Sequence, residues 1–407
     1  MVSLPEATDV LVVGGGMVGS AAAYFLSRAG LSVVLCERGN LCSEATGKQG
    51  GMVTQIDGRD LNVGLNSVKL SYTRESNKIY DILQDELQFD FQYRRRGGLD
   101  IAFQDDEFEH LSKLYHIQKQ NGDDEIQLLD EKELRSLCPA ISPLAKGARY
   151  RASDANISTF MFVYALITGA KEYGAKVFTH TKVKEICFNN HNEVVGVNTE
   201  KGYIRTDWVF NAGGAWAGDL TSELDIVPVC STAAISEPIP PVHIQTFEAE
   251  LEGKVVYGGT QTARGNLLFG ASLLDPRRRE DHYNNSLSLG DVRYTASVIS
   301  RIFPELSNVN ILRAWGGTMG WSADNLPYVG QVPGKKGLIV AAAFPNGGAY
   351  APILTKLACE IICKGQPSLP LDLFDIGRFS RRMDWPEVYD YSILGDFLAN
   401  EQNVKQS

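Results

Sequence analysis

Residues 9–39, DVLVVGGGMVGSAAAYFLSRAGLSVVLCERG, limit the possible folds of this chain more than any other stretch. An apolar run meets glycines spaced Gly14-x-Gly16-x-x-Gly19, a helical pattern follows, and a second apolar run ends at Glu37. Glycine at these positions permits a tight turn, close approach of a pyrophosphate and close packing of the helix on its strand. A carboxylate 18 residues beyond Gly19 can accept hydrogen bonds from a ribose. The stretch therefore predicts a strand–turn–helix–strand unit that binds a dinucleotide with an unphosphorylated ribose, either FAD or NAD.

The composition indicates a globular protein and argues against several kinds of partner. With 407 residues, of which 44% are apolar and 22% charged, the chain is long enough for two domains. A net charge of −10 argues against nucleic acid as a partner, and no apolar run is long enough to span a membrane. The seven cysteines are dispersed without a C-x-x-C pair, and no secretory signal precedes the first strand. We therefore expect a cytoplasmic protein with reduced thiols and no metal site.

Three later segments place small residues where a backbone could approach the same ligand. Residues 41–55 have neither helical nor strand period and follow Glu37 directly, so they form either a cover over the cofactor or an ordinary surface loop. DWVFNAGGAW (207–216) places glycines after a buried strand, and the strand at 337–343 runs into FPNGG before an apolar helix. Because such turns aim backbone N–H groups at a ligand, we expect the last two segments to approach one long dinucleotide.

Four segments taken together resemble the D-amino-acid oxidase family of flavoenzymes. That family includes glycine oxidase, sarcosine oxidases and the flavin subunits of opine- and proline-type dehydrogenases. The segments are VVGGGMVGSAAAYFLSRAG with Glu37-Arg38, EATGKQGGM, DWVFNAGGAW, and RAWGGTMGWSADNLPYVG followed by FPNGGAYAP, and they occur in family order. The resemblance spans about residues 8–379 and implies FAD as the cofactor.

The alternation of elements and the resemblance together imply an α/β fold with two domains. A discontinuous Rossmann-like FAD-binding domain is expected from residues 1–88, 145–225 and 311–379. A mixed-sheet α+β substrate domain is expected from residues 89–144 and 226–310, where short alternating strands precede a helix near 289–303. Residues 380–407 lose periodicity and are treated as a C-terminal tail.

The resemblance also assigns cofactor-binding positions along the chain. It implies that the glycine turn holds the pyrophosphate, that Glu37 binds the adenosine ribose, that Val183 meets the adenine, and that the last turn lies at the pyrimidine end of the flavin. The candidates are Gly14, Gly16, Met17, Val18, Gly19, Glu37, Arg38, Ala45, Thr46, Gln49, Gly51, Met52, Val183, Ala212, Gly213, Asn346, Gly347, Gly348, Ala349 and Tyr350. Family members that attach flavin covalently use a cysteine in the segment matching 313–325, and this chain has none there, so non-covalent FAD is expected.

Departures from the family pattern bear on the substrate. Members similar to glycine oxidase carry an arginine for the substrate carboxylate where this chain has Met319, and a second where it has Pro345. Either Arg264 holds a carboxylate from the substrate domain, or the substrate has no carboxylate at that end. Met319 either faces the substrate or merely fills the pocket. Tyr257 matches a tyrosine that lines the pocket in relatives, or it packs within its sheet.

The resemblance implies FAD-dependent oxidation of a C–N bond in a small amine or amino acid, such as a secondary amine, an opine, an imino acid or a D-amino acid. Hydride transfer to flavin N5 would give an imine that hydrolyses. The missing arginine favours the dehydrogenase subunits, which pass electrons to a partner polypeptide, over free-standing glycine oxidase. Two alternatives stay open: oxidation of a 2-hydroxy acid, which needs a base for the hydroxyl proton, and a flavin-carrying interaction subunit with an inactive pocket.

Overall fold

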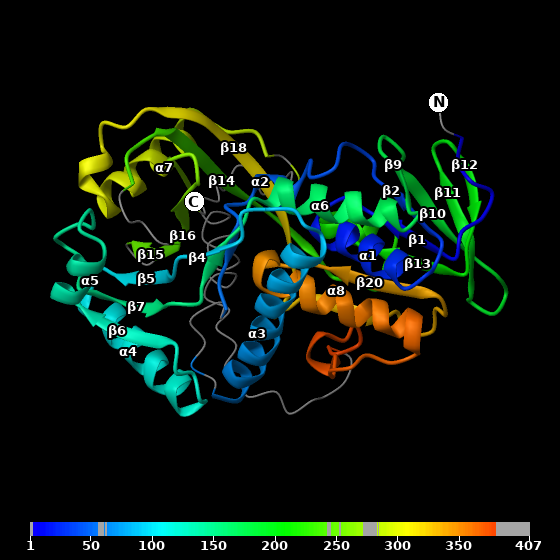
Figure 1. Ribbon diagram of the computed structural model, residues 1–407, viewed down its shortest axis with the longest axis horizontal. Coiled ribbons are helices and arrows are strands. Elements are labelled where there is room, and N and C mark those ends of the chain that lie inside the picture. Colours follow the sequence, from blue (N-terminus) through cyan, green and yellow to red (C-terminus); the bar gives the residue numbers. More distant parts are fainter. Residues whose placement is uncertain are drawn as a thin grey trace, which may run out of the picture.

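The computed structural model describes residues 3–55, 61, 63–241, 246–251, 254–271, 283 and 285–379. Figure 1 shows two groups of elements, one around a large mixed sheet and one around a smaller sheet that contains the N-terminal strand. The predicted tail, 380–407, lies outside the described residues. Among the described helices, none has the length and apolar character that crossing a membrane requires.

A six-stranded sheet contains the glycine-rich unit. Its order is β19-β20-β13-β1-β2-β9, and every neighbouring pair is parallel except β19 with β20. The chain order reverses at β1, because β2 and β9 lie on one side of it and β13 and β20 on the other. The strands are β1 (Val10–Val13), β2 (Val33–Cys36), β9 (Lys176–Phe178), β13 (Trp208–Asn211), β19 (Tyr328–Gln331) and β20 (Leu338–Ala342).

The two faces of this sheet bury separate apolar clusters, as expected for parallel strands. One face packs against four helices and the other against a three-stranded sheet. Gly19 explains the closeness of the first helix, because a Cβ there would collide with the carbonyl oxygen of Gly14. The elements are α1 (Met17–Arg28), α3 (Val63–Glu86), α6 (Thr159–Glu172) and α8 (Gly347–Lys364), and β10 (Val183–Phe188), β11 (Val194–Thr199) and β12 (Gly202–Arg205).

An eight-stranded sheet forms the second group, in the order β18-β14-β17-β16-β15-β5-β7-β6. All of its pairs are antiparallel except β15 with β5. The strands are β5 (Gly98–Ala102), β6 (Ile126–Asp130), β7 (Gly147–Arg151), β14 (Val227–Pro238), β15 (Thr246–Leu251), β16 (Lys254–Gln261), β17 (Asn266–Ala271) and β18 (Ile311–Trp321). Its helices are α4 (Asp105–Gln120), α5 (Glu131–Leu137) and α7 (Leu289–Ile302).

Short elements connect the two groups. A three-stranded sheet in the order β3-β8-β4 lies where segments from both groups meet. The remaining elements are α2 (Ala45–Lys48), β3 (Met52–Val53), β4 (Arg94–Arg95), β8 (Ala155–Asn156), and the 3₁₀ helices η1 (Gly214–Asp219), η3 (Pro304–Leu306) and η4 (Asp372–Phe374). The stretch 41–55, expected to be without regular structure, therefore contains α2 and β3.

The α/β class with a Rossmann-like sheet and a second, mixed sheet is confirmed. The structure differs from the predicted segment boundaries in two strands. Strands β7 and β18 lie in segments assigned to the FAD-binding domain, yet both pair within the eight-stranded sheet. Each strand joins a partner that is remote in sequence, and local periodicity does not identify such a partner.

Candidate functional site

A cavity with about 1360 Å³ of empty space, part of it open to solvent, lies at the carboxyl ends of β1, β2, β13 and β20. This is where the strand order reverses, the position at which open α/β sheets bind ligands. Most of the lining comes from turns that follow strands. The lining residues are 13–18, 36–38, 42–46, 49, 182–183, 212–216, 219–220, 319–320, 341–345, 347 and 351.

The cavity brings together 13 of the predicted cofactor-binding residues. They are Gly14, Gly16, Met17, Val18, Glu37, Arg38, Ala45, Thr46, Gln49, Val183, Ala212, Gly213 and Gly347. The other candidates do not belong to the lining. Gly19 packs on Gly14. Gly51 and Met52 lie just before and in β3, and Asn346, Gly348, Ala349 and Tyr350 lie just before and in the first turn of α8.

The glycine turn is held by side-chain acceptors. Glu37 is 8% exposed, and its two carboxylate oxygens accept the backbone N–H groups of Gly15 at 2.6 Å and Gly39 at 2.7 Å. The N–H of Met17, at the start of α1, donates to Thr46 Oγ1 at 3.0 Å. Each carboxylate oxygen keeps a further lone pair, so Glu37 can stabilise the turn and still accept a ribose hydroxyl.

One wall of the cavity contains a charged and aromatic group that sequence reasoning missed. The guanidinium of Arg38 lies 3.9 Å from the centroid of the Trp216 ring, and Trp216 stacks on Tyr283 at 5.3 Å. Glu44 pairs with Arg38 at 3.5 Å and with Lys48 at 3.1 Å. Trp216 ends the AGGAW segment, whose glycines indicate a ligand-binding turn, so the position of this tryptophan beside the turn could have been predicted from the sequence.

The first turn of α8 lies at the other end. Asn346 caps it, because Asn346 Oδ1 accepts the N–H of Ala349 while Asn346 Nδ2 donates to Thr54 Oγ1 at 2.7 Å. Gly348 lies directly against the carbonyl of Met52, where a Cβ would collide with that oxygen. Strand β3 thus supports the turn from behind, and Gly347 faces the cavity.

Of the three substrate candidates, the structure places Met319 at the cavity. Met319 is partly buried in β18 opposite Val229 of β14, and Phe344 and Pro345 line the cavity with it. Arg264 is exposed in the turn between β16 and β17 and does not belong to the described lining, because the hairpin end directs this residue to solvent. Tyr257 lies in β16, and its side chain is outside the described part of the structure.

Charge is distributed unevenly along the cavity. The arginine and lysine side chains among its described lining residues are Arg38 and Lys182. Both residues lie next to Glu37. Arg38 follows it in sequence, and Thr181, the neighbour of Lys182, donates its N–H to the backbone carbonyl of Glu37. Met319, Phe344 and Pro345 are apolar lining residues of the same cavity.

Two thiols also line the cavity, but they are poor nucleophiles and metal ligands. Burial raises the pKa of Cys36 to about 12 and that of Cys42 to about 12, so both are neutral at physiological pH. In the part of the chain that the structure describes, no group of three His, Cys, Asp or Glu side chains is arranged to hold a metal ion.

These residues fit a long dinucleotide. The glycine turn and Glu37 suit a pyrophosphate and a ribose, and the α8 N-terminus at the far end offers backbone N–H groups to an electron-rich ring.

Comparisons with known proteins agree with this geometry. The family model "DAO: FAD dependent oxidoreductase" matches residues 9–361. The hydrogen cyanide synthase subunit HcnC of Pseudomonas protegens is 24% identical, with 90% of this chain and 94% of that protein covered. Glycine oxidase of Bacillus licheniformis is 24% identical over 87% of this chain and 92% of its own length. The crystal structure of L-proline dehydrogenase from P. horikoshii superimposes with a TM-score of 0.82 at 27% identity, covering 93% of this chain and 99% of that one.

Proposed function

Because the chain belongs to the DAO family of FAD-dependent oxidoreductases, we propose that it oxidises a C–N bond in a small amine or amino acid. The membership confirms the predicted FAD cofactor and oxidoreductase class. FAD, when bound, accepts a hydride from the carbon next to the substrate nitrogen. The remaining task of the protein is to hold cofactor and substrate in register and to exclude water.

The observation that carries the proposal is that Met319, Phe344 and Pro345 give an apolar lining to the cavity that Gly347, in the first turn of α8, also lines. An apolar wall disfavours an ammonium ion and favours the neutral amine. The neutral amine has a free lone pair on nitrogen, which assists departure of the hydride from the adjacent carbon. An alcohol would need a base to remove its hydroxyl proton, and the described residues at this wall offer none.

The named relatives support the substrate class. Glycine oxidase and L-proline dehydrogenase are named for amino acids, and the HcnC protein is named as a subunit of a synthase. We therefore include in the proposal that electrons pass from the flavin to a partner polypeptide. FAD is held without a covalent bond in this proposal, since residues 313–325 contain no cysteine.

An anaerobic screen tests the proposal. The purified holoprotein is mixed with primary and secondary amines, with both enantiomers of amino acids, and with 2-hydroxy acids, and bleaching of the flavin absorbance is followed. We expect bleaching by at least one amine or amino acid and none by hydroxy acids. Bleaching by hydroxy acids alone would overturn the C–N assignment, and retained FAD without bleaching by any compound would favour an interaction subunit.

A further inference from the structure

Helix α8 contains a proline, and a side chain of another helix donates to the backbone carbonyl that the proline leaves without a helical donor. Pro352 has no N–H, so the carbonyl oxygen of Gly348, four residues earlier, lacks the usual helical hydrogen bond. The hydroxyl of Tyr80 in α3 donates to that oxygen at 2.8 Å. Tyr80 is fully buried, where an unsatisfied carbonyl is costly. The tyrosine hydroxyl thus replaces the bond that the proline removes.

The same hydroxyl also contacts the first turn of α1. Tyr80 Oη lies 3.8 Å from the sulfur of Met17, the first residue of α1. Met17 and Gly347 both line the cavity, so Tyr80 lies between the two helix starts that face the cofactor. Figure 1 shows α3 crossing beside the start of α8.

The phenol ring is itself held in place. It stacks on Tyr93 with ring centroids 4.9 Å apart and contacts Phe162 at 5.1 Å. Burial raises the pKa of Tyr80 well above its usual value, so the hydroxyl stays protonated and remains a donor. A fixed ring with a permanent donor acts as a rigid spacer between the two turns.

The first turn of α8 is joined to its own helix by one hydrogen bond fewer than usual, although the N–H of Tyr350 donates to the carbonyl oxygen of Asn346 at 3.3 Å. Asn346 Oδ1 caps the N–H of Ala349, which leaves the N–H groups of Gly347 and Gly348 outside the helical bonding pattern. Pro352 removes the next bond that would join this turn to the rest of the helix. The orientation of these N–H groups therefore depends also on contacts from other elements, among them the hydrogen bonds with Tyr80 and Thr54.

We propose that Tyr80 is a positioning residue for FAD, whose hydroxyl sets the first turn of α8 at a fixed place relative to the first turn of α1. The FAD assignment on which this rests follows from family membership and is independent of the proposed substrate. Loss of the hydroxyl lets the turn move out of the arrangement that binds FAD. The apparent affinity for FAD then falls in proportion to the fraction of molecules that keep this arrangement.

The first test compares Tyr80→Phe with Tyr72→Phe. Both tyrosines are buried on α3 and both hydroxyls donate to a backbone carbonyl. Tyr72 bonds to Pro370, whereas Tyr80 also contacts Met17, which lines the cavity. We expect the dissociation constant of FAD from the apoprotein to rise about two- to tenfold in Tyr80→Phe. Tyr72→Phe should bind FAD as the wild type does while losing comparable thermal stability. Wild-type FAD affinity in Tyr80→Phe, or an equal loss in Tyr72→Phe, would overturn the proposal.

The second test restores the missing helical donor. Pro352→Ala supplies an N–H for the carbonyl of Gly348, so the Tyr80 hydroxyl becomes dispensable. In the Pro352→Ala background, Tyr80→Phe should leave the FAD dissociation constant nearly unchanged, a coupling that a double-mutant cycle measures directly. If removal of the hydroxyl weakens FAD binding as much in that background as in the wild type, Tyr80 does not act through Gly348 and the proposal fails.

Discussion

Replacement of Glu37 by glutamine tests two roles of one carboxylate, which are to hold the glycine turn and to bind the ribose of FAD. In the structure its oxygens accept the N–H groups of Gly15 and Gly39. The amide of glutamine keeps one acceptor oxygen but turns an NH₂ group toward the other N–H donor. One charge-assisted hydrogen bond is therefore lost in a buried site, which costs about 1.5–3 kcal/mol. The apoprotein of Glu37→Gln should lose about 2 kcal/mol in free energy of unfolding.

The effect on FAD follows from the same geometry. If ribose hydroxyls donate to the remaining lone pairs of Glu37, the neutral amide weakens them too, and the dissociation constant of FAD should rise at least about tenfold, since 1.4 kcal/mol corresponds to that factor. Urea unfolding of the apoprotein measures the first effect, and FAD titration by quenching of flavin fluorescence measures the second. Glu44→Gln is the matched control, because Glu44 also lines the cavity but makes only partly exposed ion pairs, each contributing less than about 1 kcal/mol.

Two results would refute this reasoning in different ways. A Glu37→Gln apoprotein within about 0.5 kcal/mol of the wild type would show that the bonds to Gly15 and Gly39 do not stabilise the turn. Lower stability with unchanged FAD affinity would show that Glu37 holds the turn without contacting the ribose.

Three further variants test other parts of the molecule. Met319→Arg should increase the affinity for carboxylated amines at least about tenfold if Met319 faces the substrate, because a guanidinium forms bidentate bonds with a carboxylate; ligand titration of the flavin spectrum measures it. Arg378→Met should destabilise the protein by roughly 3–5 kcal/mol in urea unfolding, because it leaves the buried carboxylate of Asp324, now bonded at 2.7 Å by two guanidinium nitrogens, without its positively charged partner. The free energy of unfolding of the wild type should fall as pH rises from about 4 to 6 because of Asp154, and Asp154→Asn should not show this fall. Burial raises the pKa of Asp154 from 3.8 to about 6, so between these values the folded state keeps a proton that the unfolded chain releases, and folding is disfavoured by up to roughly 3 kcal/mol above that window.

Each of these variants has a control. Leu312→Arg adds the same charge to an exposed position of β18 and should leave ligand affinity unchanged; equal effects of both arginines would contradict a substrate contact at Met319. Lys336→Met breaks an exposed pair with Glu193 and should cost less than about 1 kcal/mol; a similarly small loss in Arg378→Met would contradict the buried-pair argument. Asp90→Asn is the control for Asp154→Asn. It removes an exposed carboxyl whose pKa is lowered by Arg94, so its stability relative to the wild type should not rise between pH 4 and 6. If the stability of Asp154→Asn relative to the wild type does not rise between pH 4 and 6, the assignment of the titration is wrong.

Several local features could be predicted because their cause lies within a few residues. The helix expected near 289–303 is α7, and its start is set by a capping box in which Ser288 and Asp291 bond to each other's backbone. The ends of such elements depend on caps and turns that adjoin them in sequence.

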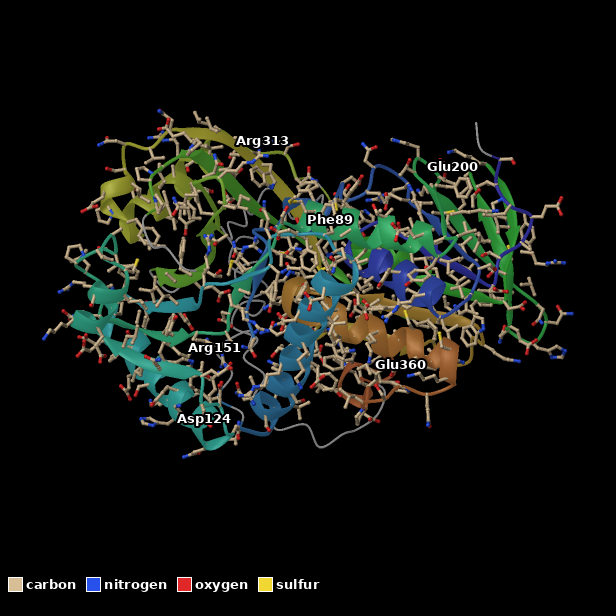
Figure 2. All side chains as sticks on the ribbon, viewed as in Figure 1. Phe89, Asp124, Arg151, Glu200, Arg313 and Glu360 are labelled. Carbon is tan, nitrogen blue, oxygen red and sulfur yellow. The ribbon has the colours of Figure 1, made fainter. Side chains whose placement is uncertain are left out.

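Features that depend on distant partners escaped prediction. Arg151 on β7, labelled in Figure 2, pairs with Asp123 within the eight-stranded group, although this segment had been assigned to the nucleotide domain. Arg264 was a candidate for a carboxylate, yet a turn places it in solvent. A sequence shows that a strand or a cation is present, whereas its neighbours in space are set by the packing of the whole chain.

The glycine-rich stretch shows where the division lies. By itself the sequence predicted a glycine-rich strand–turn–helix unit, a carboxylate after its second strand and two later glycine turns, because each depends on backbone freedom and charge at adjoining residues. Only the tertiary structure decided that Glu37 bonds two backbone N–H groups, that Trp216 packs under Arg38, and that the hydroxyl of Tyr80 meets the carbonyl left open by Pro352. Tyr80 and Gly348 are separated by 268 residues, and their contact exists because α3 and α8 pack against each other.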